Sequence, residues 1–428
     1  MAGGLLTPEL RKNFHHLYAD ILWFGVLAGS TMAFLAVYAT RLGASSFQIS
    51  LLTAGPGVVN LLLSLPAGRM LERSPLVWTT FRSAVLHRAG YLFLVLLPLL
   101  VAPHVEIWAV VFLILAMSVP GTLLAIGFNA LFADAVPPEW RGDVVAKRNA
   151  LVAISLTTSA LLSGQLLDRI VFPLIYQIVF AIGALGAVMS TYHVGKLSIS
   201  GHGTPPRVGR PLFDFARPGM WRFGDAIRLA VGMRFLTRSQ GKPMLRLDLM
   251  RTAFGPFLVA YLLFYTFQYL PLPILPLFYV HELNLTDGAI SLGSALFHAV
   301  MMMFSLRISQ WSTRYGHYRL LVIGAISFCL YPLVIGLARD ATLFWAASLL
   351  GGGAWAITSA GLINRLMEKV PQDSRPAYMA LHNLALNLGI LAGSLAGPVL
   401  SHWIGLREAV LAAAGLRLLA GIFLAIWG

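Results

Sequence analysis

Long apolar runs without charged residues constrain this chain more strongly than any other feature of its sequence. Residues 107–131 and 171–194 are each long enough to cross the hydrocarbon core of a bilayer, which takes about 20 apolar residues. Inside lipid the backbone finds no water to bond, so such a segment must be helical. Only 11% of the 428 residues are charged, whereas soluble proteins average about 25%. The sequence therefore predicts an all-α polytopic membrane protein.

Hydropathy predicts twelve transmembrane helices in two related halves. Residues 137–149 match residues 371–383: both begin with proline, and an acid, an arginine, an alanine and an asparagine follow at equal spacing. We expect pseudo-symmetric six-helix bundles over 1–194 and 251–428, joined by a cytoplasmic central loop over 195–250 that contains an amphipathic helix. The expected transmembrane ranges are 14–40, 46–68, 80–101, 107–132, 147–167, 171–194, 253–279, 287–306, 319–338, 342–366, 378–402 and 408–427.

The basic residues indicate the orientation in the membrane. The chain has 31 Lys and Arg against 17 Asp and Glu, and most of the basic residues fall in the loops on the side of the N-terminus. This positive-inside bias predicts a multi-pass protein of the cell inner membrane with both termini in the cytoplasm. The net charge of +14 thus reflects the orientation of the chain in the membrane and does not indicate a nucleic-acid surface. The lone Cys329 provides neither a disulfide nor a cysteine metal site, and no cofactor is expected.

Small residues recur every four positions in three of the expected helices, and each set lies on one helix face. Close backbone packing contributes much of the association of helices in lipid. These faces predict either static helix interfaces or smooth surfaces along which two halves rock. The three sets are Ser155, Ser159 and Ser163; Ser291, Ala295 and Ala299; and Gly389, Gly393 and Gly397.

Short loop motifs resemble those of the major facilitator superfamily. The segment 68–73 is similar to the family's G-x-x-x-D-R motif, with Glu in place of Asp, and 314–319 is similar to its tail. The segment 137–142, Pro-Pro-Glu-Trp-Arg-Gly, is also typical of the family. The resemblance implies alternating access, with the first, fourth, seventh and tenth helices lining a central cavity. The family's antiporter signature is absent from 147–167, so the direction of transport stays open.

The resemblance also implies a charged gate at the cytoplasmic helix ends. There a carboxylate can pair with arginine and face the N-terminus of a neighbouring helix. The alternative is ordinary interfacial charge, since exposed ion pairs contribute little free energy. The candidate gate residues are Gly68, Glu72, Arg73, Asp134, Arg141, Arg314, Glu368 and Arg375.

Polar and aromatic side chains in the second half predict a solute cavity. Tyr261, Tyr265, Gln268 and Tyr269 follow helical spacing and form one hydrogen-bonding stripe, an odd surface to place against lipid. The alternative is hydrogen bonding between helices, worth about 0.6 kcal/mol on average in membranes. Prolines follow the stripe and indicate a hinge or a frayed helix end. Three further candidates for solute binding are Trp355, Asn383 and Asn387.

Titratable groups inside the expected helices are candidates for coupling to a proton or another ion, because buried charge in membranes is costly and usually functional. Asp20 is either such a site or an ion-pair partner, and His298 is either a proton carrier or a packed neutral side chain. Arg88 is expected to snorkel towards the membrane surface. The sequence indicates no partner for Arg417.

Together these patterns predict a monomeric transporter, in contact with membrane lipids, that moves a small organic solute by alternating access. Proton coupling and export are favoured. Two alternatives remain: a passive facilitator of a sugar-like or amphipathic solute, and a non-transporting scaffold or receptor with the same fold. No nucleophile elbow, zinc-protease motif or phosphate-binding glycine loop is present, so an enzyme is not expected.

Overall fold

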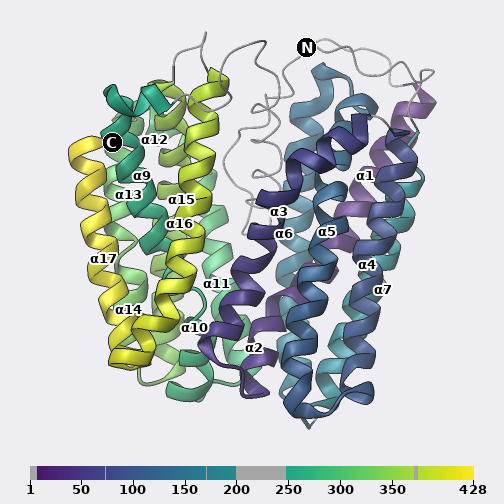
Figure 1. The fold of residues 1–428 in the computed structure, drawn as a ribbon, viewed down its shortest axis with the longest axis horizontal. Helices are drawn as coiled ribbons and strands as arrows, with labels where there is room; N and C mark the ends of the chain where they lie inside the picture. The colour runs from purple at the N-terminus through teal and green to yellow at the C-terminus, as the bar shows by residue number, and fades with distance from the viewer. Residues whose placement is uncertain (1–6, 73, 170, 199–246, 371–374) are drawn as a thin grey trace. The chain divides into compact units, whose positions relative to one another are not determined.

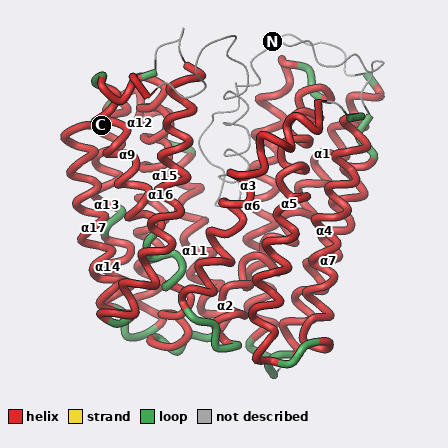
Figure 2. Tube along the Cα trace, in the orientation of Figure 1, coloured by secondary structure: helices red, strands yellow, loops and turns green. Residues whose placement is uncertain are grey.

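The computed structural model describes residues 7–72, 74–169, 171–198, 247–370 and 375–428, and in these ranges all regular structure is helical (Figures 1 and 2). Eleven helices of the described chain are long and apolar enough to cross a membrane. The prediction of an all-α polytopic membrane protein is therefore confirmed. The linker helix expected within 195–250 falls on residues outside the described ranges.

The chain divides into two compact units. Described residues of Met1–Phe34 and Leu62–Arg217 form unit 1, and those of Leu35–Leu61 and Pro218–Gly428 form unit 2. The helices of the first part of the chain are α1 (Pro8–Leu27), η1 (Ala28–Met32), α2 (Ala33–Arg41), α3 (Ser46–Glu72), α4 (Leu76–Leu100), α5 (Pro103–Ala135), α6 (Pro138–Leu167) and α7 (Leu174–Gly195). The later helices are η3 (Leu247–Arg251), α9 (Phe254–Tyr269), α10 (Leu275–Leu277), η4 (Phe278–Glu282), α11 (Asp287–Ser305), α12 (Ile308–Tyr315), α13 (His317–Ser327), α14 (Leu330–Leu337), α15 (Ala341–Lys369), α16 (Arg375–Ile404) and α17 (Leu406–Trp427).

Residues 35–61 belong to unit 2 although the sequence repeat assigns them to the first half. The Arg41 guanidinium binds the Asp287 carboxylate, with Nη2 2.8 Å from Oδ1, and it also donates to the Leu285 carbonyl. The Ser50 hydroxyl donates to the Ser394 carbonyl over 2.7 Å. These bonds attach α2 and α3 to helices that follow residue 251.

In unit 1, α1 packs against α6 and α7, and α4 packs against α5 and α7. A Cβ added at Gly25 would lie only 2.7 Å from the Cβ of Ser155, so α1 and α6 approach closely at that point. Ser155 also donates a hydrogen bond to the Leu22 carbonyl over 2.7 Å. The small face expected on 147–167 is thus a helix interface in this structure.

In unit 2, α9 packs against α16 and α17, while α15 packs against α11 and α13. The predicted glycine face of α16 lies directly on α9. A Cβ added at Gly389 would lie 2.6 Å from the Cβ of Tyr265, and one added at Gly393 would lie 3.0 Å from the backbone nitrogen of Leu270. The glycines are needed here because only a residue without a side chain lets the two backbones come this close.

The helix expected over 253–279 is broken. It consists of α9, a turn, the short α10 and the π-helix η4. Pro271 and Pro273 occupy the turn, and a proline removes one backbone donor and clashes with the preceding helical turn. Hydropathy could not reveal the break because these residues are as apolar as their neighbours.

We expect Gly393→Leu to destabilise the protein because the new side chain must push α16 away from α9. Overpacking of this kind typically costs about 1–3 kcal/mol. Gly415→Leu on α17 is the matched control, since nothing lies within 4 Å of a Cβ added there. Thermal unfolding of both variants in detergent measures the effect, and equal melting temperatures would contradict close packing at Gly393.

Candidate functional site

A buried ion cluster around Asp20 joins four helices of unit 1. Asp20 on α1 has an exposed fraction of only 3%. Its carboxylate lies 3.2 Å from Nη2 of Arg148 on α6 and 3.7 Å from Nη2 of Arg88 on α4. The Ser190 hydroxyl on α7 donates a hydrogen bond to the same carboxylate. One acid and two bases therefore leave a net positive charge inside this unit.

The two guanidinium groups are held by further contacts. Arg148 donates to the Leu17 carbonyl over 2.5 Å and lies 4.9 Å from the ring centre of Phe128. Arg88 donates to the Thr191 hydroxyl over 3.2 Å and is 7% exposed. The expectation that Arg88 snorkels to the surface is wrong, because a buried carboxylate is within its reach.

Arg148 and Ser190 are members of this cluster that the sequence did not single out. Arg148 follows Lys147 and looks like one more basic loop residue. However, α6 already begins at Pro138, which places Arg148 well inside a helix. The signal available in the sequence was Pro137-Pro138-Glu139, a typical helix start.

His298, the other coupling candidate, lies on α11 in unit 2. It is half-buried, and its ring packs against that of Phe297 with the centroids 5.5 Å apart. Its role in coupling stays a prediction.

The predicted tyrosine stripe lies in the interior of unit 2. The Tyr261 hydroxyl donates to the Leu362 carbonyl over 2.9 Å, and the Tyr265 hydroxyl lies 3.0 Å from Nε2 of His382. Gln268 is 6% exposed and its buried Oε1 has no hydrogen-bond partner, while Tyr269 is half-buried. His382 is a contact that the sequence did not indicate, although its neighbour Asn383 was a predicted cavity residue.

The other solute candidates lie in the same unit. Trp355 on α15 is half-buried, and its ring packs at a tilt of 36° against that of Phe328 with the centroids 5.3 Å apart. Asn383 and Asn387 on α16 are both buried, and the Asn387 amide donates to the Asn383 carbonyl over 2.7 Å. Seven predicted residues are therefore largely interior, and their role in binding stays a prediction.

The candidate gate residues lie in different settings. Arg141 donates to the carbonyls of Ala133 and Val136 at the C-terminal end of α5, over 2.6 and 2.9 Å. Gly68 is half-buried, and Asp134 is exposed near the end of α5. The side chains of Glu72, Arg73 and Arg375 lie outside the described part of the structure.

The remaining two gate candidates are exposed. Glu368 on α15 accepts from Arg365 over 3.0 Å and lies 3.8 Å from His317. Arg314 lies over the ring of Tyr315 at 5.5 Å. Such exposed contacts contribute little free energy, and gating by these residues stays a prediction.

Arg417, for which the sequence indicated no partner, binds the broken helix. Pro271 has no N–H to offer the Phe267 carbonyl, and the Leu272 N–H bonds Tyr269 instead of Gln268. Arg417 on α17 donates to both open carbonyls, over 3.4 Å to Phe267 and 2.8 Å to Gln268. Its guanidinium also lies 4.6 Å from the ring centre of Phe328. Arg417 thus replaces the two backbone donors that these carbonyls lose at the break.

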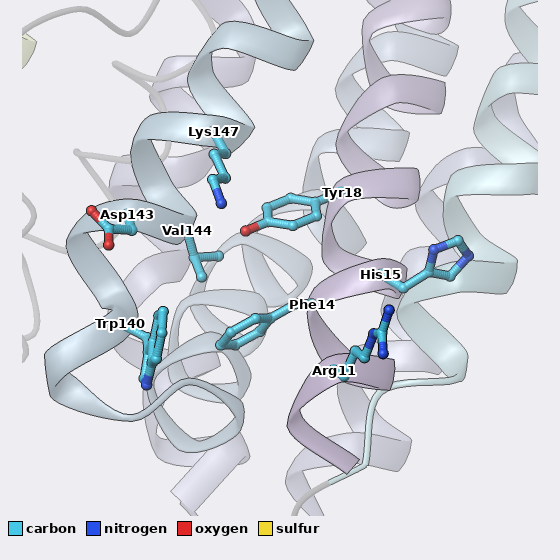
Figure 3. A pocket seen from close by; sticks show the side chains of 8 residues that line it. All are labelled: Arg11, Phe14, His15, Tyr18, Trp140, Asp143, Val144 and Lys147. Atoms are coloured by element: carbon cyan, nitrogen blue, oxygen red, sulfur yellow. The ribbon is translucent and has the colours of Figure 1, made fainter. Parts of the chain in front are cut away.

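A small open pocket lies where the start of α1 meets the start of α6 (Figure 3). Its volume is about 270 Å³, below the range of about 300–1,000 Å³ that is usual for solute sites. In Figure 3 the Lys147 amine and the Tyr18 hydroxyl point towards one another, and the Asp143 carboxylate points away. The lining residues are Arg11, Phe14, His15, Tyr18, Trp140, Asp143, Val144 and Lys147.

We expect Arg417→Leu to lower stability by about 1–3 kcal/mol for each carbonyl left unpaired in the interior. Arg417→Lys keeps one donor group and should recover part of the loss. Arg339→Leu, an exposed arginine, serves as the control. Thermal unfolding of the three variants tests the assignment. The assignment fails if Arg417→Leu has the same melting temperature as the control.

Comparison with known proteins assigns the family. The family model described as Major Facilitator Superfamily matches residues 21–240 and 257–428. Among solved structures, the nucleoside transporter NupG aligns with a TM-score of 0.67 at 14% identity, covering 97% of this chain and 98% of that one. A D-xylose–proton symporter aligns with the same score and identity, covering 97% of both chains. At this identity the structural likeness shows the fold alone.

Curated relatives match over shorter stretches. Multidrug resistance protein 2 of Bacillus subtilis (strain 168) is 22% identical over 151 residues, which is 35% of this chain and 37% of that protein. The multi-drug resistance efflux pump PmrA homolog of Lactococcus lactis subsp. lactis (strain IL1403) is 29% identical over 119 residues, 26% of this chain and 27% of that protein. The matched stretches thus span little more than a third of these relatives at most.

Proposed function

The chain belongs to the Major Facilitator Superfamily, and on that basis we propose that this transporter exports a small organic solute by proton-coupled alternating access. Export is supported by the curated relatives, whose names describe multidrug resistance and efflux. A neutral or weakly charged solute suits the tyrosine stripe and Trp355, because aromatic rings offer apolar surface together with hydrogen-bonding groups.

The observation that supports proton coupling is the buried position of Asp20. Three acids of the described chain are buried: Asp20, Glu106 and Asp287. Glu106 and Asp287 lie in the first turns of α5 and α11, whereas Asp20 lies well inside α1. Ionisable groups at such depth in membrane helices usually mark ion or substrate pathways.

The cluster also provides a physical link between protonation and conformation. A proton on Asp20 would remove the one carboxylate that faces Arg88 and Arg148. An uncompensated buried charge costs about 3–5 kcal/mol, so the protonated cluster would favour a different arrangement of α4 and α6 against α1. A proton can thereby bias the equilibrium between two conformations of the transporter.

A passive facilitator is the second candidate function. It is favoured by the same ion pairs, because a carboxylate paired with two guanidinium groups can serve as a fixed structural bridge between helices. Uphill transport distinguishes the two functions.

We further propose that the protein lies in the cell inner membrane as a monomer with both termini in the cytoplasm. Support comes from the loop distribution of Lys and Arg. The exposed side chain of Lys147 on α6 is a suitable target for labelling from either side.

We expect Asp20→Asn to abolish pH-driven accumulation in proteoliposomes and to leave downhill exchange intact, because the amide cannot carry the proton. His298→Ala tests the second coupling candidate in the same assay. Glu139→Gln, an exposed acid, is the control. Uphill transport that persists in Asp20→Asn would exclude Asp20 as the coupling residue.

We expect a bound solute to raise the melting temperature of the wild type, and this shift to shrink in Tyr265→Phe and Gln268→Ala. Loss of one hydrogen bond should weaken binding by about tenfold. Tyr315→Phe, which alters an exposed tyrosine, should behave as the wild type. A thermal-shift screen of drugs, sugars and nucleosides provides the measurement. Equal shifts in all variants would place the solute elsewhere.

A further inference from the structure

Three polar contacts join α1 to α7 and the residues that follow it, and they succeed one another from the helix ends to Asp20. We call the series a ladder and each contact a rung. At the outer rung, Asn13 donates to the Ser198 carbonyl over 2.8 Å, and the Ser198 hydroxyl also contacts the exposed Glu9. The middle rung is a pair of histidines, His16 and His193. The inner rung is the bond from Ser190 to Asp20.

The two inner rungs are one helical turn apart on each helix. His16 precedes Asp20 by four residues on α1, and His193 follows Ser190 by three on α7. The histidines are half-buried, whereas Asp20 and Ser190 are 3% and 0% exposed. The histidine pair therefore stands between solvent and the buried carboxylate.

The histidine contact itself involves a proton. Nδ1 of His16 lies 3.0 Å from Nδ1 of His193, and the ring centroids are 5.3 Å apart. Two bare nitrogens would repel at this distance, and so would two N–H groups, so one ring must donate and the other accept. In the neutral pair the two rings are therefore opposite tautomers.

The neutral pair can bind one additional proton but not two. One added proton yields an imidazolium that still donates to a neutral imidazole. A second would place two N–H groups and two positive charges against each other, so the two rings titrate as a coupled unit. The titratable and charged groups around the pair are Lys12, His15 and Asp20 on α1 and Tyr192 and Lys196 at the end of α7, while Arg88 on α4 and Arg148 on α6 face Asp20.

We propose that His16 and His193 form a one-proton site through which the coupled proton passes between solvent and Asp20. This inference rests on the proposed function and identifies the proton pathway of the same transporter. No other rung of the ladder has a group that both binds and releases a proton near neutral pH.

The proposed transfer conserves protons at each step. The histidine pair takes one proton from solvent and becomes singly charged. The Ser190 hydroxyl then gives its proton to the Asp20 carboxylate and receives one from the pair, which returns to neutral. Asp20 becomes a neutral carboxylic acid, and its ion pairs with Arg88 and Arg148 are lost. The reverse sequence releases the proton.

Imidazole ¹⁵N NMR of the full chain in nanodiscs tests the one-proton site without any solute. In the wild type, His16 and His193 together should take up one proton from about pH 8 to 5. In His16→Gln or His193→Gln, the remaining ring should titrate independently, with a shifted midpoint. His15→Gln removes a neighbouring ring outside the Nδ1 contact, so the pair should still take up a single proton. Two independent protonations in the wild type would overturn the inference.

Infrared spectroscopy after a pH jump tests the pathway. A carboxylic acid band that is missing in Asp20→Asn belongs to Asp20. Its rate of appearance should fall by about tenfold in His16→Gln and His193→Gln and stay unchanged in His15→Gln. Equal rates in all variants would overturn the pathway. Absence of the band in the wild type would instead overturn proton coupling through Asp20, and the NMR result would still decide whether the pair binds one proton.

Discussion

Backbone polar groups that are buried in lipid must find their partners within the protein, and this constraint organises the structure. It acts most strongly at helix ends, where the last carbonyls lack intrahelical donors. Arginine supplies those donors repeatedly. Arg141 binds two carbonyls at the end of α5, Arg407 binds those of Gly336 and Ala338 at the end of α14, and Arg417 binds two at the end of α9. The basic composition therefore serves helix termination as well as membrane orientation.

The same constraint explains how a broken helix can exist inside unit 2. A proline break in lipid would leave carbonyls unpaired at a cost of about 1–3 kcal/mol each. Arg417 removes this cost, and the glycine face of α16 lets α9 pack closely just before the break. The tyrosine stripe is thereby held in the interior, with Tyr265 bonded to His382. A bend stabilised in this way is a suitable hinge for a transporter helix.

In unit 1, buried polar groups find their partners as ion pairs. Asp20, Arg88 and Arg148 satisfy one another across three helices, and Ser190 adds a fourth. Under the proposed coupling, a proton on Asp20 would remove the one negative charge that faces the two guanidinium groups. The ladder of Asn13, His16 and Asp20 along α1 connects this proton to the helix end. Structure and proposed coupling thus depend on the same side chains.

The sequence by itself determined the membrane fold, the approximate spans, the resemblance to the family and the close-packing faces, because all of these follow from local hydropathy and helical spacing. It did not reveal that Arg148 faces Asp20, that His382 meets Tyr265, or that Arg417 binds carbonyls near Pro271. Those contacts join residues that lie 117 to 150 positions apart. Only the tertiary structure decides them, because a side chain's partner depends on which helix packs beside it, and hydropathy contains no information about that.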